Sequence, residues 1–333
     1  MDAVANVQTG YEFGRHGDPY LSNEAAIRDF WSVRVGDEFV SHYPPGAALH
    51  VAPLYAVWPS DARVARALII GEERDLRIPP LAPAAIVSAA VTALAVGLVA
   101  VASNRLVSSW HAVGAGIALG VGTGAWAVAS DQLWQHGPAM MWVAAGMVLS
   151  VNRPLGGGFA FGIAAITRPH AALVGLGVAG ARRFEDRKLW PAVGIAGLTA
   201  KGVAAVVAYN AWVFGGASIS GGYSEGFVAR LLALDNLRWF AGNVVGSLID
   251  PARGLIVYSP FLLFLIPGLP YAWRDSPWWA RGAAVGGLLY LVVQLKANRF
   301  SGGEFFFSYR YPLEAPTAAA PLLALAYAGW VAR

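Results

Sequence analysis

The feature that most constrains this chain is a series of long apolar segments, some of which carry no charge. Residues 79–103 contain no Asp, Glu, Lys or Arg, and residues 82–103 alone reach the roughly 20 residues that a helix needs to cross a bilayer. Of the 333 residues, 56% are hydrophobic and 13% are charged, whereas a soluble domain is about 25% charged. This pattern predicts an integral membrane protein.

The apolar segments predict an all-α fold, a polytopic transmembrane helical bundle with about nine spans. Four of the segments are shorter than a full span, and Arg168-Pro169 separates two of these. Because irregular backbone at membrane depth is tolerated only where protein lines a cavity, we expect some helices to stop beside one. The segments are residues 82–103, 110–130, 139–151, 155–166, 171–181, 190–214, 254–273, 282–295 and 312–331.

The first 80 residues differ from the rest and form the first of two predicted domains. More than half of the 20 acidic residues precede position 76, and residues 47–58 form an apolar run that is too short to span. We therefore expect an external loop over residues 1–80 with a short juxtamembrane helix at the interface, followed by a transmembrane helical domain over residues 81–333.

Basic residues in the short loops indicate the orientation, because they favour the cytoplasmic side of a membrane. When the loop at Arg105 is placed inside and each span reverses direction, nine basic residues lie inside against Glu185, Asp186 and Asp275. The external face then receives residues 1–80, 130–138, 167–170, 215–253 and 296–311. We therefore expect any active site on the external face of the cell membrane.

Arg168 is the strongest candidate for a functional residue. It lies between two short apolar segments, and an arginine at membrane depth normally faces a cavity or pairs with an anion. Its planar guanidinium suits bidentate binding of phosphate. Arg310 closes a stretch rich in glycine and aromatic residues just before the last apolar segment, where snorkelling to lipid head groups is the structural alternative.

Several function classes lack their signatures. The chain has no cysteine, which excludes disulfides and thiolate metal sites. The phosphate-binding G-x-x-x-x-G-K-[ST], the G-x-S-x-G of hydrolases and the H-E-x-x-H of zinc enzymes do not occur. The net charge of +4 is accounted for by membrane topology, so nucleic acid is not an expected partner.

An ordered set of short motifs runs over nearly the full length of the chain. They occupy residues 2–5, 17–21, 43–46, 122–126, 130–136, 167–169, 209–210, 214–215, 254–260, 301–303 and 309–312. In this order they resemble the GT-C superfamily of membrane glycosyltransferases, especially bacterial members akin to the protein mannosyltransferases and the lipid A aminoarabinose transferase. The resemblance implies transfer of a sugar from a polyprenyl-phosphate donor to a glycan, lipid or protein acceptor.

The resemblance also assigns roles to particular residues. Asp2, the acid at the start of the first external loop, would be the general base for the acceptor hydroxyl, and Asp131 would be a second acid in the catalytic cavity. Arg168 and Arg310 would hold the donor phosphate, which needs no metal for this purpose.

Three further residues would contact the acceptor or line the cavity: His42, Tyr43 and Glu304. No cofactor is implied, although some relatives use a divalent ion. In relatives a transmembrane helix directly precedes the acid that corresponds to Asp2, so we expect an apolar segment upstream of Met1. Phe300 stands where the family usually has tryptophan.

Two other function classes remain open from the sequence. A transporter or lipid flippase also has broken helices and charges at membrane depth. A noncatalytic relative of the enzyme family would share its motifs. The clustering of polar segments on one face, without a convincing internal repeat, favours the enzyme.

Overall fold

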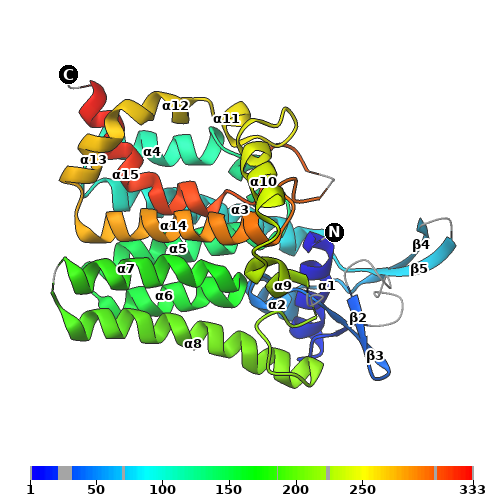
Figure 1. Ribbon diagram of the computed structural model, residues 1–333. Coiled ribbons are helices and arrows are strands. Elements are labelled where there is room, and N and C mark those ends of the chain that lie inside the picture. The colour runs from blue at the N-terminus through cyan, green and yellow to red at the C-terminus, as the bar shows by residue number, and fades with distance from the viewer. Residues whose placement is uncertain are drawn as a thin grey trace.

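The computed structural model describes residues 2–21, 32–69, 72–185, 187–222, 226–303 and 306–331. It is 70% helical and 6% strand, which confirms the expectation of a mostly helical protein. Long helices lie side by side in a bundle, and shorter helices and strands cover one end of it (Figure 1). We call this the capped end of the bundle.

The bundle consists of helices that cross it from end to end in alternating directions. Several start at or just after a proline, where the missing N–H costs no hydrogen bond: α3 follows Pro80, α6 begins at Pro154 and α14 follows Pro277. The helices are α3 (Leu81–Ser103), α4 (Ser109–Val121), α5 (His136–Ser150), α6 (Pro154–Thr167), α7 (Ala172–Phe184), α8 (Leu189–Phe214), α14 (Trp278–Ala297) and α15 (Glu314–Val331).

Two helices of the described residues, α3 and α8, are long and apolar enough to cross a bilayer. The expectation of about nine such spans is not met. The helices α4 and α6 are apolar but have 13 and 14 residues, which makes them about 20 Å long against a hydrocarbon thickness of about 30 Å. Glycine at position 122 ends α4, and the Arg168-Pro169 step ends α6.

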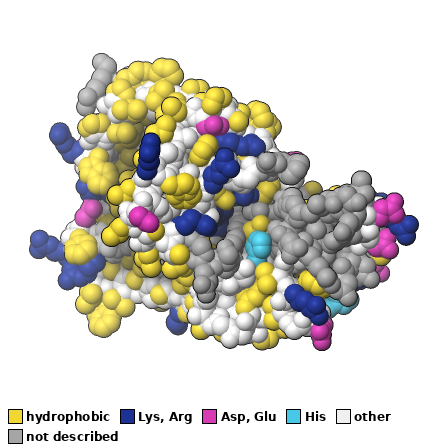
Figure 2. Space-filling view, turned by 45° about the vertical axis from the view of Figure 1, so that its right-hand side comes forward, with side chains coloured by type: hydrophobic (Ala, Val, Ile, Leu, Met, Phe, Trp, Pro, Cys, Tyr) yellow, Lys and Arg dark blue, Asp and Glu magenta, His cyan; other side chains and the backbone are white. Residues whose placement is uncertain are grey.

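The outer surface of the bundle carries many apolar side chains. Leu94 and Ile117 are each 55% exposed, and Leu288 is 60% exposed. Figure 2 shows hydrophobic side chains spread over the bundle face in view, with charged groups between them. Extended apolar surface of this kind marks contact with lipid or with another protein and agrees with membrane association.

Residues 254–273, expected as one full span, form a broken series of short elements. Prolines at positions 260, 267 and 270 restrict the residues before them and remove backbone donors, so no continuous helix forms. The pieces are α11 (Leu255–Tyr258), α12 (Phe261–Leu265), η3 (Ile266–Gly268) and α13 (Leu269–Asp275). Residues 110–130 are likewise divided, into α4 and the π-helix η1 (Ala125–Ala129).

The first 80 residues contain more regular structure than expected. Helix α2 (Gly46–Val57) matches the short helix expected at 47–58, and α1 (Asp2–Arg15) packs against it. Two small antiparallel sheets depart from an all-α fold. They are formed by β1 (Tyr20–Leu21), β2 (Ser32–Val35) and β3 (Glu38–Ser41) in the order β1-β3-β2, and by β4 (Arg63–Ile69) with β5 (Glu72–Ile78).

The sheet of β4 and β5 was not predicted, because its sequence is rich in charged residues of both signs. Arg66 on β4 lies 3.7 Å from Glu73 and 3.5 Å from Asp75 on β5. In the sequence these residues suggest only a charged loop, whereas across two strands they form favourable pairs.

Helices α9 (Gly226–Leu232) and α10 (Leu237–Ile249) also lie at the capped end of the bundle (Figure 1).

Small residues set the spacing of the helices. A Cβ atom added to Gly202 on α8 would lie 2.0 Å from the backbone oxygen of Gly162 on α6, so the two backbones are in direct contact. Close approach through small residues is the usual way in which helices associate in lipid, where no hydrophobic force drives them together.

Candidate functional site

A buried polar cluster lies where four helices of the bundle reach the capped end. Helices α5 and α15 begin there, whereas α6 and α14 end there (Figure 1). The cluster is defined by six side chains that these helices and the adjoining loops supply: His136, Arg168, His170, Gln294, Arg310 and Glu314. Among them, Arg168, Arg310 and Glu314 carry formal charge.

Glu314 is the most deeply buried member of the polar cluster. Its side chain is 0% exposed, and Nδ1 of His136 lies 2.9 Å from Oε1 and 3.1 Å from Oε2. The Nε atom of Arg168 is 3.4 Å from the same Oε1. Because a carboxylate only accepts hydrogen bonds, His136 donates from Nδ1.

Arg168 lies at the centre of the polar cluster. Helix α6 ends at Thr167, and Arg168 adopts an extended backbone (φ −142°, ψ 106°), as expected for a residue before proline. Its Nη1 donates to Nε2 of His136 at 2.9 Å, and its Nη2 donates to Oε1 of Gln294 at 3.3 Å. The sequence predicted a buried arginine but not its carboxylate neighbour.

Tyr311 connects the two arginines. The guanidinium of Arg168 lies 5.9 Å from the centre of the Tyr311 ring, and that of Arg310 lies 4.9 Å from it. Arg310 is also stacked 4.6 Å from the ring of Trp134, and its side chain is buried. Both arginines predicted as phosphate ligands therefore contact one aromatic side chain.

A cavity of about 470 Å³ opens beside Arg168; we call it the Arg168 cavity. Arg168, His170 and Gln294 provide polar groups in its wall, while Leu173, Val203 and Phe227 contribute apolar surface. It lies among α7, α8, α9 and α14. A cavity of this composition suits a ligand with a charged head and an apolar body.

A close backbone contact places the N-terminal domain against this cavity. A Cβ atom on Gly46 would lie 2.4 Å from Cα of Thr167, so the start of α2 abuts the residue before Arg168. Pro44 accordingly lines the Arg168 cavity. The neighbouring His42 and Tyr43 are half-buried, with ring centres 4.2 Å apart, and do not line the cavity.

Of the predicted acids, only Asp131 has a described side chain, and it does not line the Arg168 cavity. Asp131 is exposed and lines a separate cavity of about 610 Å³ together with Ala3 of α1 and Leu133. Asp2 is the first residue of α1, and its side chain lies outside the described residues. Glu304 also lies outside them.

The segment from Asp131 to His136 connects the two cavities. Asp131 and Leu133 line the second cavity, Gln135 lines the Arg168 cavity, and His136 enters the polar cluster. The side chain of Asn6 on α1 donates to the carbonyl of Leu133 at 2.9 Å. This contact holds α1 against the segment.

Glu314 and Gln294 were missed by the sequence interpretation. Glu314 is the single charged residue in the segment 312–331, which was interpreted as an ordinary span. An acid within an apolar segment marks a functional or paired position, so this signal was present. Gln294 carried no comparable signal.

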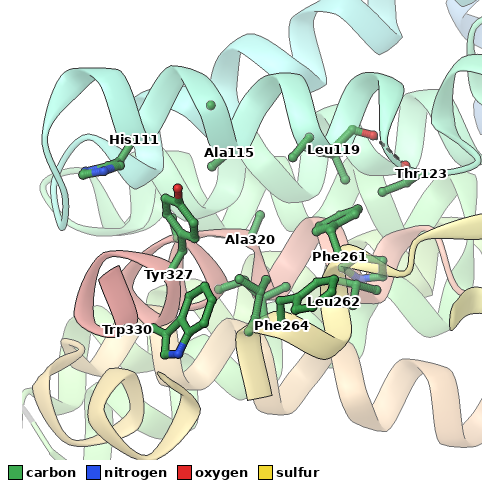
Figure 3. Close-up of a pocket in the computed structure, with 16 residues that line it drawn as sticks. His111, Ala115, Leu119, Thr123, Phe261, Leu262, Phe264, Ala320, Tyr327 and Trp330 are labelled. Carbon is green, nitrogen blue, oxygen red and sulfur yellow. Dashed lines mark hydrogen bonds between the residues drawn. The ribbon is translucent and has the colours of Figure 1, made fainter. Parts of the chain in front are cut away.

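A third cavity, which is apolar and measures about 520 Å³, lies between α4, α12 and α15 (Figure 3). Phe261, Phe264 and Leu119 lie toward one end, and His111, Tyr327 and Trp330 lie at the other. Among the described residues that line it there is no Asp, Glu, Lys or Arg.

Neither a search for metal-binding groups nor comparison with known proteins assigns a role to further residues. Within the described residues, no group of three or more His, Cys, Asp and Glu side chains is arranged to hold a metal ion. No protein-family model, curated protein or solved structure matches this chain.

Proposed function

We propose that this chain is a multi-pass membrane glycosyltransferase of the GT-C type. It transfers a sugar from a polyprenyl-phosphate donor to an acceptor on the external face of the membrane. The observation that carries this proposal is the buried Arg168 in the wall of a cavity that is otherwise largely apolar. A lipid phosphate has the same division between a charged head and an apolar chain.

The polar cluster supports a role in holding the donor phosphate. Attack of an acceptor hydroxyl on the anomeric carbon breaks its bond to the phosphate oxygen, which leaves with the electron pair. Arg168 and Arg310, both buried and both against Tyr311, would stabilise that negative charge in a water-poor site. The acceptor proton goes to a carboxylate. Asp2 and Asp131 are candidates from the family resemblance alone, because Asp131 lines a separate cavity and the side chain of Asp2 lies outside the described residues.

The apolar walls of the Arg168 cavity suit the part of the isoprenoid chain nearest the phosphate. They are formed by α7, α8, α9 and α14, and α8 is one of the two helices long and apolar enough to span a bilayer. The remaining short helices complete about nine membrane passages in this proposal. The capped end then faces outward, away from the basic loop at residues 182–188.

The test is a transfer assay with the purified chain in proteoliposomes. We expect transfer from radiolabelled polyprenyl-phosphate sugars but not from nucleotide sugars, and we expect loss of transfer in Arg168→Ala with Arg310→Ala. An exposed arginine, Arg183, gives the matched control as Arg183→Ala. Transfer from nucleotide sugars, or unchanged rates in the double variant, contradicts the proposal.

A lipid transporter is the second candidate, and the buried Glu314–His136 pair favours it. Paired acid and histidine side chains inside a helical bundle are common in proton-coupled transport. Movement of a fluorescent polyprenyl phosphate across the bilayer without any sugar transfer would support this candidate. The absence of both activities, with lipid phosphate still bound, would identify a noncatalytic relative.

A further inference from the structure

The polar cluster has a small net charge because Glu314 offsets one arginine. Its charged members are two guanidinium groups and one carboxylate, which leaves a surplus of one positive charge among the described side chains. All three of these side chains are at most 7% exposed. Water therefore screens their effect on a bound ligand only weakly.

The hydrogen bonds indicate that His136 does not add a further charge. Its Nδ1 donates to Glu314, and its Nε2 lies 2.9 Å from Nη1 of Arg168. The same Nη1 also lies 3.2 Å from Nδ1, so the arginine charge is held against the whole ring and disfavours a second positive charge there. The ring is therefore neutral, with its proton on Nδ1 and with Nε2 as the acceptor, because an arginine nitrogen can only donate. The same reasoning applies to Nε2 of His170, 3.4 Å from Nη2 of Arg168.

We propose that Glu314 determines the charge specificity of the phosphate site, allowing one negative charge to bind and disfavouring two. This inference rests on the proposed function, because it assumes that the Arg168 cavity receives a lipid phosphate. A phosphodiester carries one negative charge and matches the surplus of the cluster. A phosphate monoester or a diphosphate carries more and is repelled by the Glu314 carboxylate.

For the reaction, this charge specificity favours release of the lipid phosphate product. The donor is a phosphodiester with one charge, and transfer converts it to a phosphate monoester with a charge of about −1.5 to −2 at pH 7. The acceptor proton leaves with the base, so the added charge stays on the lipid phosphate. Glu314 then raises the free energy of the bound product relative to the bound donor and favours its departure.

The test compares two lipids that differ by one charge. A polyprenyl phosphate monoester and its methyl phosphodiester are titrated against the full chain in nanodiscs at pH 7.5. We expect the wild-type protein to bind the diester more tightly. In Glu314→Gln, which keeps the shape and an acceptor for His136, affinity for the monoester should rise at least about tenfold relative to the diester.

A second buried carboxylate gives the matched control. Glu12 on α1 is 4% exposed and pairs with Arg77 at 3.8 Å, away from the lining of the Arg168 cavity. Glu12→Gln should leave the ratio of the two affinities unchanged. Below pH 6, where the monoester loses its second charge, the wild-type preference for the diester should also decrease.

If Glu314→Gln does not fold, a variant that adds a negative charge to the polar cluster provides the test. Gln294 lies 3.3 Å from Arg168, so Gln294→Glu adds a negative charge beside the same guanidinium and should weaken monoester binding more than diester binding. Binding of both lipids with an unchanged ratio in the variants overturns this inference alone. Binding of neither lipid by the wild-type protein overturns the proposed donor site itself.

Discussion

Glu314 and His136 form a buried pair between side chains that are 178 residues apart in the chain, with Nδ1 of His136 2.9 Å from Oε1 of Glu314. The pair joins the first residue of α5 to the first residue of α15. It therefore ties two helix starts together at the capped end. Removing either partner would leave the other buried without its hydrogen bond.

A double-mutant cycle measures this coupling. We expect His136→Leu and Glu314→Leu each to lower the free energy of unfolding by about 1–3 kcal/mol, because each removes one of the polar partners of a buried group. The double variant should lose less than the sum of the two. Equilibrium unfolding in mixed micelles gives the four values, and strict additivity would mean that the pair contributes no coupling.

The helix spacing predicts different effects of alanine at two glycines of α8. At Gly202 a Cβ would lie 2.0 Å from the oxygen of Gly162, whereas at Gly197 no atom lies within 4 Å. Gly202→Ala should therefore separate α6 from α8 and destabilise the protein by about 1–3 kcal/mol. Gly197→Ala should be neutral or stabilise by up to about 1 kcal/mol.

Thermal unfolding of the two variants in the same detergent provides the comparison. Both substitutions add one methyl group to the same helix, so helix propensity cancels between them. Equal melting temperatures for the two variants would contradict the close contact of α6 with α8.

His50 on α2 makes stability sensitive to acid. Burial lowers the pKa of this side chain below its usual 6.5, only partly opposed by its hydrogen bond to the carbonyl of Gly46. Trp142 donates to its Nε2 at 2.7 Å, which requires the neutral ring. The unfolded chain takes up a proton near pH 6.5, so this contribution is complete above that pH and is lost as the pH falls through the folded pKa.

Melting temperatures measured between pH 8 and pH 5 test whether the stabilising contribution of His50 decreases as the pH falls. The difference in melting temperature between wild type and His50→Gln should shrink as the pH falls. The same difference for His111→Gln, at the opposite end of the bundle, serves as the comparison. A His50 contribution that grows toward pH 5 would contradict the neutral assignment.

Much of the fold could be predicted from the apolar segments, because the tendency of an apolar segment to form a helix is encoded locally. Helices α3, α5 and α8 lie where the sequence placed them, within a few residues. The break at residues 254–273 follows from its prolines, whereas the expectation of one full span rested on hydrophobicity alone.

The candidate site could be predicted only in part, because its contacts join distant segments. Arg168 was identified from its place between two short apolar segments, which is a local signal. Its contact with Glu314 joins two positions 146 residues apart in the chain, which no local pattern specifies. Likewise, the two arginines were paired by family resemblance, whereas their shared contact with Tyr311 emerged only from the packing.

The proposed topology can be tested with single cysteines, because the chain has none of its own. We expect Ser218→Cys, in an exposed loop at the capped end, to react with a membrane-impermeant thiol reagent in intact cells. Arg183→Cys, exposed near the end of α7, should react only after the cells are opened. The reverse pattern would place the capped end in the cytoplasm and remove the external site.

The last prediction concerns the shape of the Arg168 side chain. Its guanidinium donates to His136 and Gln294 from separate nitrogens while Nε faces Glu314, so its plane is fixed by three neighbours. A lysine retains the charge but offers one nitrogen and cannot reproduce this geometry. We expect Arg168→Lys to lower kcat/KM for the lipid donor about 10- to 100-fold.

Arg168→Ala should lower kcat/KM further, because it also removes a charge contact that strengthens as the phosphate leaves. Arg182, which is also buried and donates to the carbonyl of Ser150 at 2.7 Å, provides the control for general effects of replacing a buried arginine. It lies at the opposite end of α7, so Arg182→Lys should change the melting temperature more than kcat/KM. Equal losses of kcat/KM in Arg168→Lys and Arg182→Lys, at matched stability, would show that Arg168 acts through folding and not through the donor phosphate.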